Sequence, residues 1–118
     1  MPISAKRLWI VDQASGEVLL NTHVGHARKS GFWRPRIISN TPDSNLTCCG
    51  LFVTGEIYRQ DTRLRVVGLD PGVNDEALDR GIVFHAGNFP WWPWSAGCFT
   101  TPERDNRRIV EIARDGAV

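Results

Sequence analysis

The sequence has no long apolar run, almost no excess of charge and few cysteines. No run of apolar residues approaches the roughly 20 that are needed to cross a bilayer, so we expect no membrane span. Fourteen basic residues oppose 13 acidic ones, which leaves a net charge of +1 and predicts no wholesale binding to nucleic acid or to an anionic membrane. At 118 residues the chain can bury one core, so we expect a single domain over 1–118 and a monomer.

The three cysteines cannot all be paired within one chain. Cys48 and Cys49 are adjacent, and adjacent cysteines pair with each other only under strain. We therefore expect three free thiols and a reducing compartment. The first residues pass directly into a strand-like run at Leu8 without the apolar stretch of a signal peptide. This favours the cytoplasm, or the periplasm if an export signal was removed from this chain.

Short β-type segments dominate the rest of the sequence. Residues 7–11 and 17–24 flank a polar stretch that ends at Gly16, which predicts a hairpin. Further strands are expected at 50–54, 63–67 and 81–85. Helices are expected only at 74–80, with Asn74 as N-cap, and at 105–114. The pattern predicts a mainly β fold with one or two short helices.

A histidine and a cysteine in the second half of the chain suggest nucleophilic chemistry. His85 ends an apolar run, and Cys98 follows an aromatic loop within the segment Ser95-Ala96-Gly97-Cys98. A thiol attacks as the thiolate, and a histidine within hydrogen-bond reach takes its proton. Gly97 allows a tight turn in which its own amide and that of Cys98 point at a developing oxyanion. These residues predict a cysteine nucleophile, Cys98, with His85 as its base.

The order of these motifs resembles the L,D-transpeptidase catalytic domain family of the YkuD type. The strand that ends in His85 and the serine-any-glycine-cysteine segment look like the family's histidine and cysteine motifs. Upstream, residues 24–31, 39–44, 50–58 and 68–80 are similar to further family segments in the same order, so the resemblance covers roughly residues 8–102. It implies a β-sandwich or barrel and acyl transfer on peptidoglycan stem peptides, without a cofactor or metal.

The resemblance also implies roles for individual residues. Cys98 is the nucleophile, His85 is the general base, and a backbone carbonyl of Ala86 or Gly87 orients the histidine. Gly97 shapes the turn. Substrate contacts are expected from a further set of side chains: Asn40, Arg80, Trp92 and Ser95. The basic loop 28–36 is an alternative partner for the substrate carboxylates.

Three departures from the family pattern concern the substrate more than the nucleophile. The spacing between His85 and Cys98 is short, and the loop between them carries Trp91, Trp92 and Trp94, either as a wall over the acyl-enzyme or as a plug that closes the core. Ala86 replaces a glycine, and Thr100 stands where many relatives have an arginine.

Three questions stay open from the residues alone. The acyl-enzyme permits hydrolysis, an L,D-carboxypeptidase that removes the terminal D-alanine of a tetrapeptide, which we favour, or transpeptidation to a cross-link. A metal-binding module that uses Cys48, Cys49 and a histidine or Cys98 is a rival, although adjacent cysteines do not match the spacing of common zinc sites. A catalytically inactive binding domain is the other rival, and the presence of both His85 and Cys98 argues against it.

Overall fold

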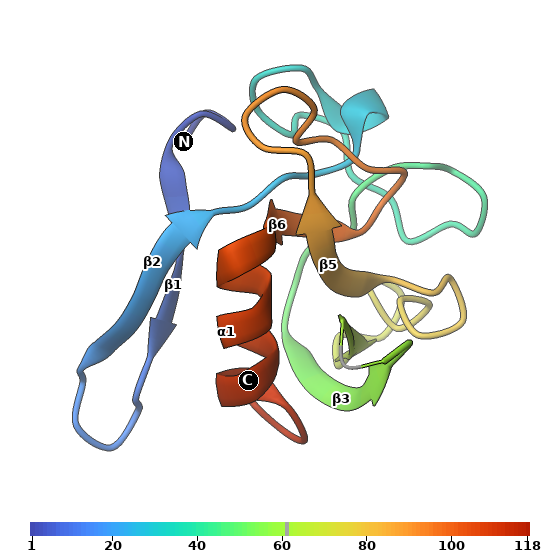
Figure 1. Cartoon of the computed structure of the whole chain (residues 1–118). Coiled ribbons are helices and arrows are strands. Elements are labelled where there is room, and N and C mark those ends of the chain that lie inside the picture. Colours follow the sequence, from blue (N-terminus) through green and yellow to red (C-terminus); the bar gives the residue numbers. More distant parts are fainter. Residues whose placement is uncertain (61) are drawn as a thin grey trace.

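The computed structural model describes residues 1–60 and 62–118 and contains two β-sheets with one α-helix. The elements in chain order are β1 (Lys6–Val11), β2 (Val18–His23), a 3-10 turn η1 (Arg28–Ser30), β3 (Phe52–Tyr58), β4 (Arg63–Gly68), β5 (Val83–Gly87), β6 (Phe99–Pro102) and α1 (Glu103–Ala113) (Figure 1). The predicted mainly β fold with one or two short helices is confirmed. In this part of the chain no helix is long and apolar enough to span a membrane.

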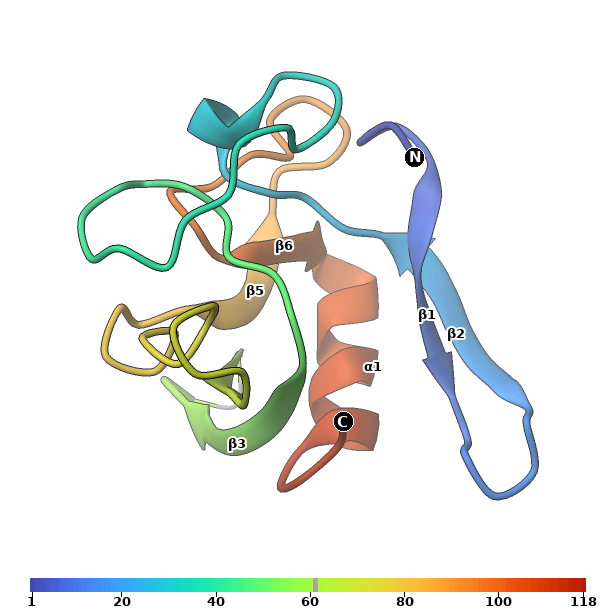
Figure 2. The ribbon, with the colours of Figure 1, turned by 180° about the vertical axis from the view of Figure 1, so that it is seen from behind.

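The predicted hairpin is present as the antiparallel pair β1–β2. Its turn forms because the Asp12 carboxylate accepts hydrogen bonds from the backbone N–H groups of Ala14 at 2.8 Å and Ser15 at 3.1 Å. An aspartate that binds its own following backbone in this way favours a turn over a continued strand. The far end of the hairpin, which we call the hairpin arm, extends away from the rest of the chain (Figures 1 and 2).

The larger sheet has the strand order β3-β4-β5-β6. Strands β3, β4 and β5 are antiparallel neighbours, whereas β5 and β6 run parallel. Strand β5 begins and ends two residues later than its predicted range, and β6 was not predicted. The parallel pair is the part of the sheet that positions the site, because it brings His85 and the end of the Cys98 turn onto neighbouring strands.

Helix α1 lies between the hairpin and the larger sheet (Figure 2). Its buried face supplies Ile109, Val110 and Ala113, which pack with Leu64 of β4. Hairpin residues cover the same cluster from the other side: Leu8, Ile10 and Leu20. A second cluster, under β5 and β6, combines Cys48, Val66, Ala77 and Ile82 with three phenylalanines: Phe52, Phe84 and Phe99. Through Phe84 and Phe99, the chain neighbours of His85 and Cys98, the second cluster contacts the segments that carry the site.

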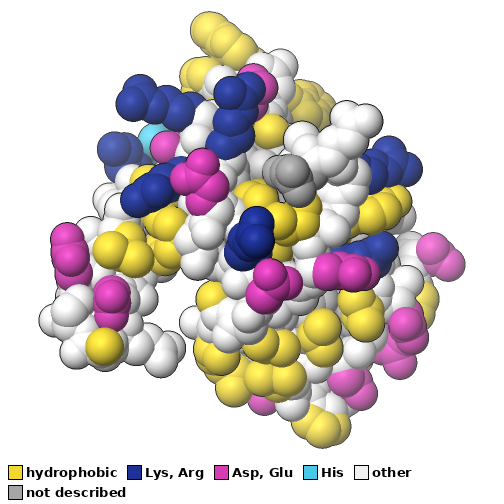
Figure 3. All heavy atoms as spheres, turned by 60° about the horizontal axis from the view of Figure 1, so that its bottom comes forward, with side chains coloured by type: hydrophobic (Ala, Val, Ile, Leu, Met, Phe, Trp, Pro, Cys, Tyr) yellow, Lys and Arg dark blue, Asp and Glu magenta, His cyan; other side chains and the backbone are white. Residues whose placement is uncertain are grey.

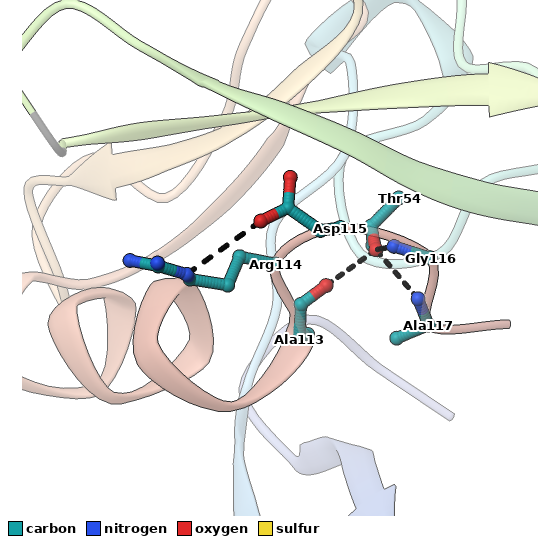
Figure 4. A network of polar contacts seen from close by, with 6 residues as sticks. All are labelled: Thr54, Ala113, Arg114, Asp115, Gly116 and Ala117. Carbon is teal, nitrogen blue, oxygen red and sulfur yellow. Dashed lines mark hydrogen bonds and ion pairs between the residues drawn. The ribbon is translucent and has the colours of Figure 1, made fainter.

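Thr54 fastens the end of the chain to β3. Its Oγ1 donates to the Ala113 carbonyl and accepts from the N–H groups of Gly116 at 3.2 Å and Ala117 at 2.8 Å (Figure 4). Its own N–H donates to the Ala117 carbonyl at 2.8 Å. One side chain therefore satisfies polar groups that the helix end leaves without intrahelical partners.

The helix predicted at 74–80 is wrong: residues 71–81 form consecutive turns. The Asn74 side chain, which was expected to cap a helix, accepts from the Asp70 N–H at 2.9 Å and donates to the Leu51 carbonyl at 2.8 Å. Asparagine that binds nearby backbone in this way competes with helix formation. Asn74 is fully buried, so this segment is fastened against the start of β3.

A groove of about 820 Å³ separates the hairpin arm from the helix side of the molecule. Figure 3 shows the arm standing apart, with acidic side chains at its tip and yellow apolar side chains gathered on the main body. Leu8 and Ile10 line the groove from the hairpin, and Ile112 and Val118 line it from the other side.

Candidate active site

Cys98 lies directly before β6, at the end of a tight turn. Its thiol donates a hydrogen bond to the carbonyl of Gly81 at 3.7 Å, and its side chain is partly exposed. Thr100 of β6, two residues further on, pairs with His85 of β5. The structure therefore places the predicted base on β5 and the predicted nucleophile directly before the neighbouring strand β6.

His85 has one ring nitrogen held and the other free. Its Nδ1 lies 2.8 Å from the Ala86 carbonyl oxygen. A carbonyl can only accept, so Nδ1 carries the proton and Nε2 is left as an acceptor in the neutral ring. Within the described residues Nε2 has no hydrogen-bond partner, and it makes no bond to the Cys98 thiol in this ligand-free state. Catalytic hydrogen bonds often tighten only when substrate is bound.

The turn before Cys98 is held by Ser95. Its Oγ donates to the Cys98 carbonyl at 2.6 Å and accepts from the Gly97 N–H at 3.1 Å. Gly97 has a φ of +145°, and an added Cβ would lie 3.0 Å from Cδ1 of Ile82, so the position favours glycine. The Gly97 N–H is thus committed to Ser95, whereas the Cys98 N–H has no partner within the described residues. Of the two amides expected to meet an oxyanion, the Cys98 amide is the one left free.

Arg80 and Asn40 are engaged with the protein itself. The Arg80 guanidinium donates to the carbonyls of Ser39 at 2.8 Å and Leu46 at 2.7 Å. The Asn40 amide donates to the Asp75 carboxylate at 2.8 Å and accepts from the Glu76 N–H at 3.1 Å. An added Cβ on Gly97 would lie 3.5 Å from Nη2 of Arg80, so this guanidinium also lies behind the nucleophile turn. Both side chains fasten the loop at 39–46 beside the site.

Trp92 lies in an exposed aromatic group and does not plug the core. Trp91 is 80% exposed and Trp92 53%. The Trp92 ring meets Trp94 edge-on at 5.3 Å, and the Arg28 guanidinium lies over it at 5.5 Å. The interpretation of this loop as a hydrophobic plug is therefore wrong for Trp91 and Trp92.

A basic cavity adjoins the nucleophile turn. It has a volume of about 460 Å³ and is lined by Arg28, Lys29, Phe32, Asn45, Ser95 and Ala96. The loops that form it, residues 28–45 and 91–96, lie side by side in both ribbon views and are joined by a bridge between Ala27 and Ser95 (Figures 1 and 2). Arg28 and Lys29 form no ion pair within the described part of the chain. The sequence predicted the basic loop 28–36 as a partner for the substrate. Nothing in the sequence indicated that Asn45 would line the same cavity.

Thr100 explains one departure from the family pattern. It is buried, and its Oγ1 donates to the Pro93 carbonyl. The Gly25 N–H donates to the Thr100 carbonyl at 2.7 Å, and a Cβ on Gly25 would collide with Thr100 Oγ1. This packing leaves no room for an arginine at position 100, and the cations that line the cavity beside the nucleophile turn are Arg28 and Lys29.

His26 is a second histidine near the site and has no free nitrogen. It is 3% exposed; its Nδ1 accepts from Arg7 at 2.6 Å and its Nε2 donates to the Gly31 carbonyl at 2.8 Å. Burial lowers its pKa, the Gly31 carbonyl opposes this, and Arg7 adds to the lowering. In the sequence, His26 lies in one of the segments that resemble the family, and we assigned it no role. Nothing in the sequence indicated that it pairs with Arg7.

All three cysteines are free thiols, as predicted. Cys48 is buried, and burial raises its pKa, with the adjacent Cys49 and Cys98 acting in the same direction and Arg80 opposing. Across residues 1–60 and 62–118 there is no group of three His, Cys, Asp or Glu side chains that could hold a metal ion. The described residues therefore provide no set of ligands for the alternative function as a metal-binding module.

The free Nε2 of His85 determines which chemistry the site can perform. An imidazole that is oriented by a carbonyl can take a proton from a thiol, which then attacks a carbonyl carbon. This is the chemistry of cysteine enzymes that transfer acyl groups.

The comparison with protein families agrees. The family model described as L,D-transpeptidase catalytic domain matches residues 1–118, and the chain belongs to this family. Membership supports a cysteine enzyme of the L,D-transpeptidase type that acts on peptidoglycan. The search of curated proteins and the search of solved structures found no match.

Proposed function

We propose that this domain is an L,D-carboxypeptidase that removes the terminal D-alanine from tetrapeptide muropeptides through a Cys98 thioester. The observation that carries the proposal is the free Nε2 of His85 on the strand beside Cys98, with Nδ1 held by Ala86. Both side chains are partly exposed, so a peptide and then a water molecule have access to them.

The first half of the reaction forms the thioester. Nε2 of His85 takes the proton of the Cys98 thiol, and the sulfur attacks the carbonyl carbon of the third stem residue. The oxyanion meets the free N–H of Cys98, a donor already in place before the charge develops. The tetrahedral intermediate breaks its C–N bond, and the protonated His85 gives its proton to the departing amine of D-alanine.

The second half releases the tripeptide. His85 takes a proton from water, whose oxygen attacks the thioester carbon. The C–S bond then breaks, and the Cys98 sulfur leaves as the thiolate while a carboxylic acid forms. The thiolate recovers its proton from His85, so each cycle consumes one water and releases one D-alanine.

The basic cavity provides the electrostatic part of substrate binding. Stem peptides carry several carboxylates, and Arg28 and Lys29 offer charge-assisted hydrogen bonds beside the turn that leads to Cys98. We assign Arg80 and Asn40 a positioning role, because their polar groups already hold the adjacent loop. Three free thiols suit a reducing compartment, where soluble muropeptides meet water as the abundant acceptor. We therefore propose a cytoplasmic site of action and hydrolysis over cross-linking.

The experiment is product analysis by liquid chromatography and mass spectrometry, with tetrapeptide and disaccharide tetrapeptide at millimolar concentration. We expect tripeptide and free D-alanine from the wild type, and neither from Cys98→Ala. A product mixture dominated by cross-linked dimer, or by exchange with an added D-amino acid, would assign transpeptidation instead. No acyl-enzyme and no product from any stem peptide would contradict both reactions.

A further inference from the structure

Aromatic side chains, exposed except for the partly buried Trp94, gather on the loops beside the nucleophile turn. Phe32 and Trp33 follow η1, while Trp91, Trp92 and Trp94 lie between β5 and the Cys98 turn. We call Phe32, Trp92 and Trp94 the aromatic platform, because their rings contact one another. Single exposed apolar side chains are common on proteins, but a contiguous group of large ones marks a binding site.

Hydrogen bonds and ring contacts hold the platform in place. Nε1 of Trp94 donates to the Phe32 carbonyl at 2.9 Å, and the two rings lie 4.6 Å apart. The Trp92 N–H donates to the Asn88 carbonyl at 2.6 Å, which closes the turn that carries the ring. A surface that is already ordered loses little entropy when a ligand binds.

Polar and cationic groups border the platform. Phe32 is shared between the platform and the basic cavity, where Arg28, Lys29 and Asn45 also lie. The surface therefore combines aromatic rings, one of them with Arg28 over it, with hydrogen-bond donors and an amide. A pyranose ring has the complementary chemistry, with C–H groups on its faces and hydroxyl and acetamido groups around its edge.

We infer that the aromatic platform binds the saccharide that carries the stem peptide, beside the basic cavity that takes the carboxylates of that peptide. The inference rests on the proposed function and names its substrate more closely: a sugar-bearing muropeptide is preferred over the free peptide. The position supports this. Ser95 Oγ lies 2.6 Å from the Cys98 carbonyl, and Trp94 is the residue before Ser95. The sugar is joined to the first stem residue and the reacting carbonyl belongs to the third, so three extended residues, about 10 Å, separate the sugar from the Cys98 sulfur.

The first test measures binding without catalysis. The Cys98→Ala protein is titrated with a peptide-free glycan fragment, a tetrasaccharide of alternating N-acetylglucosamine and N-acetylmuramic acid, and followed by nuclear magnetic resonance of the tryptophan indole N–H groups. We expect shifts at Trp92 and Trp94. Binding should weaken about tenfold in the additional variant Trp92→Ala, the equivalent of one good aromatic contact. The matched control is Trp9→Ala, an exposed tryptophan on the hairpin arm, which should bind as before.

The second test measures preference. The ratio of kcat/KM for disaccharide tetrapeptide to that for free tetrapeptide should exceed tenfold in the wild type and in Trp9→Ala, and fall toward one in Trp92→Ala. Turnover of both substrates at equal kcat/KM with no glycan binding would overturn the inference and leave the proposed function standing. Glycan binding without turnover of either substrate would support the inference and contradict the proposed function. Binding to anionic phosphatidylglycerol vesicles through Trp91 and Trp92, with no glycan binding, would also overturn it.

Discussion

The regions around His85 and His26 lie on the two sides of Thr100 and differ in what they leave unsatisfied. His85 pairs in register with Thr100 along β5, while the Gly25 N–H, next to His26, reaches the Thr100 carbonyl from the other side. Around His26 both ring nitrogens are used, one by Arg7 and one by Gly31, and the side chain is buried. Around His85 one nitrogen is held and one is free. A histidine with every hydrogen bond satisfied stabilises the fold, and one with a free nitrogen is available for proton transfer.

The largest expected effect is on the His85 side. His85→Ala removes the general base, so kcat should fall by about 10²–10⁴, while the melting temperature changes little because the ring is partly exposed and its polar bond is to the neighbouring Ala86. Steady-state kinetics and thermal unfolding of the same preparation check this. Normal kinetics in His85→Ala would remove His85 from the mechanism and end the contrast between the two regions.

His26→Ala should mainly lower stability, whereas His85→Ala should mainly lower kcat. It leaves the Gly31 carbonyl and an Arg7 donor without a partner, which costs about 1–3 kcal/mol in the free energy of unfolding. The loss is measured by urea unfolding. His23→Ala is the matched control, since His23 makes one side-chain hydrogen bond, 3.2 Å from its Nε2 to the Ser4 carbonyl, and a loose ring contact with Phe89 at 6.0 Å, and should change stability by less than about 0.5 kcal/mol. Equal stability losses in both variants would show that the buried pairing with Arg7 contributes nothing special.

Thr100→Val tests the residue between the two regions. Valine keeps the shape and removes the hydroxyl that donates to the Pro93 carbonyl, so the expected loss is about 1 kcal/mol of stability. The exposed Thr41→Val serves as its control and should lie near zero. A Thr100→Val protein as stable as the wild type would show that this hydroxyl does not hold the aromatic loop.

The smallest predicted effect is a dependence of stability on pH. Burial holds the pKa of His26 below 6.5, so between its folded pKa and 6.5 the unfolded chain binds more protons than the folded one. The stability that the lowered pKa of His26 contributes is fully present above pH 6.5 and is lost as the pH falls through the pKa of the folded state. Urea unfolding between pH 7.5 and 5.5 should show stability falling in the wild type and a shallower slope in His26→Ala. Equal slopes would contradict the lowered pKa.

The parts of the fold with local patterns were predictable from the sequence. The alternation and turn around Asp12 give the hairpin, and the apolar face with Ile109 and Val110 gives most of α1. Strand β6 was missed because it follows an irregular aromatic loop and its four residues carry little pattern of their own. The turns at 71–81 were taken for a helix because the long-range bond of Asn74 to Leu51 is not visible in a local window.

The site, like the fold, has parts that the sequence predicts and parts that it does not. Cys98, His85 and Gly97 stand out by residue type and motif, and the structure brings them to one place. What surrounds them depends on backbone atoms: the Ala86 carbonyl was expected only through the family resemblance, and the Gly81 carbonyl had no signal in the sequence. The direction of the Arg80 and Asn40 side chains, toward the protein's own loop, likewise follows from tertiary contacts alone.

The most direct test of the central claim, that His85 activates Cys98, is the rate at which each cysteine is alkylated by iodoacetamide at pH 7, followed by peptide mapping. Exposure alone ranks Cys49 first, because Cys49 is exposed, Cys98 is partly exposed and Cys48 is buried with a raised pKa. Activation by His85 predicts that Cys98 reacts fastest in the wild type and falls behind Cys49 in His85→Ala. A wild type in which Cys49 reacts fastest, with Cys98 unchanged by His85→Ala, would contradict the account.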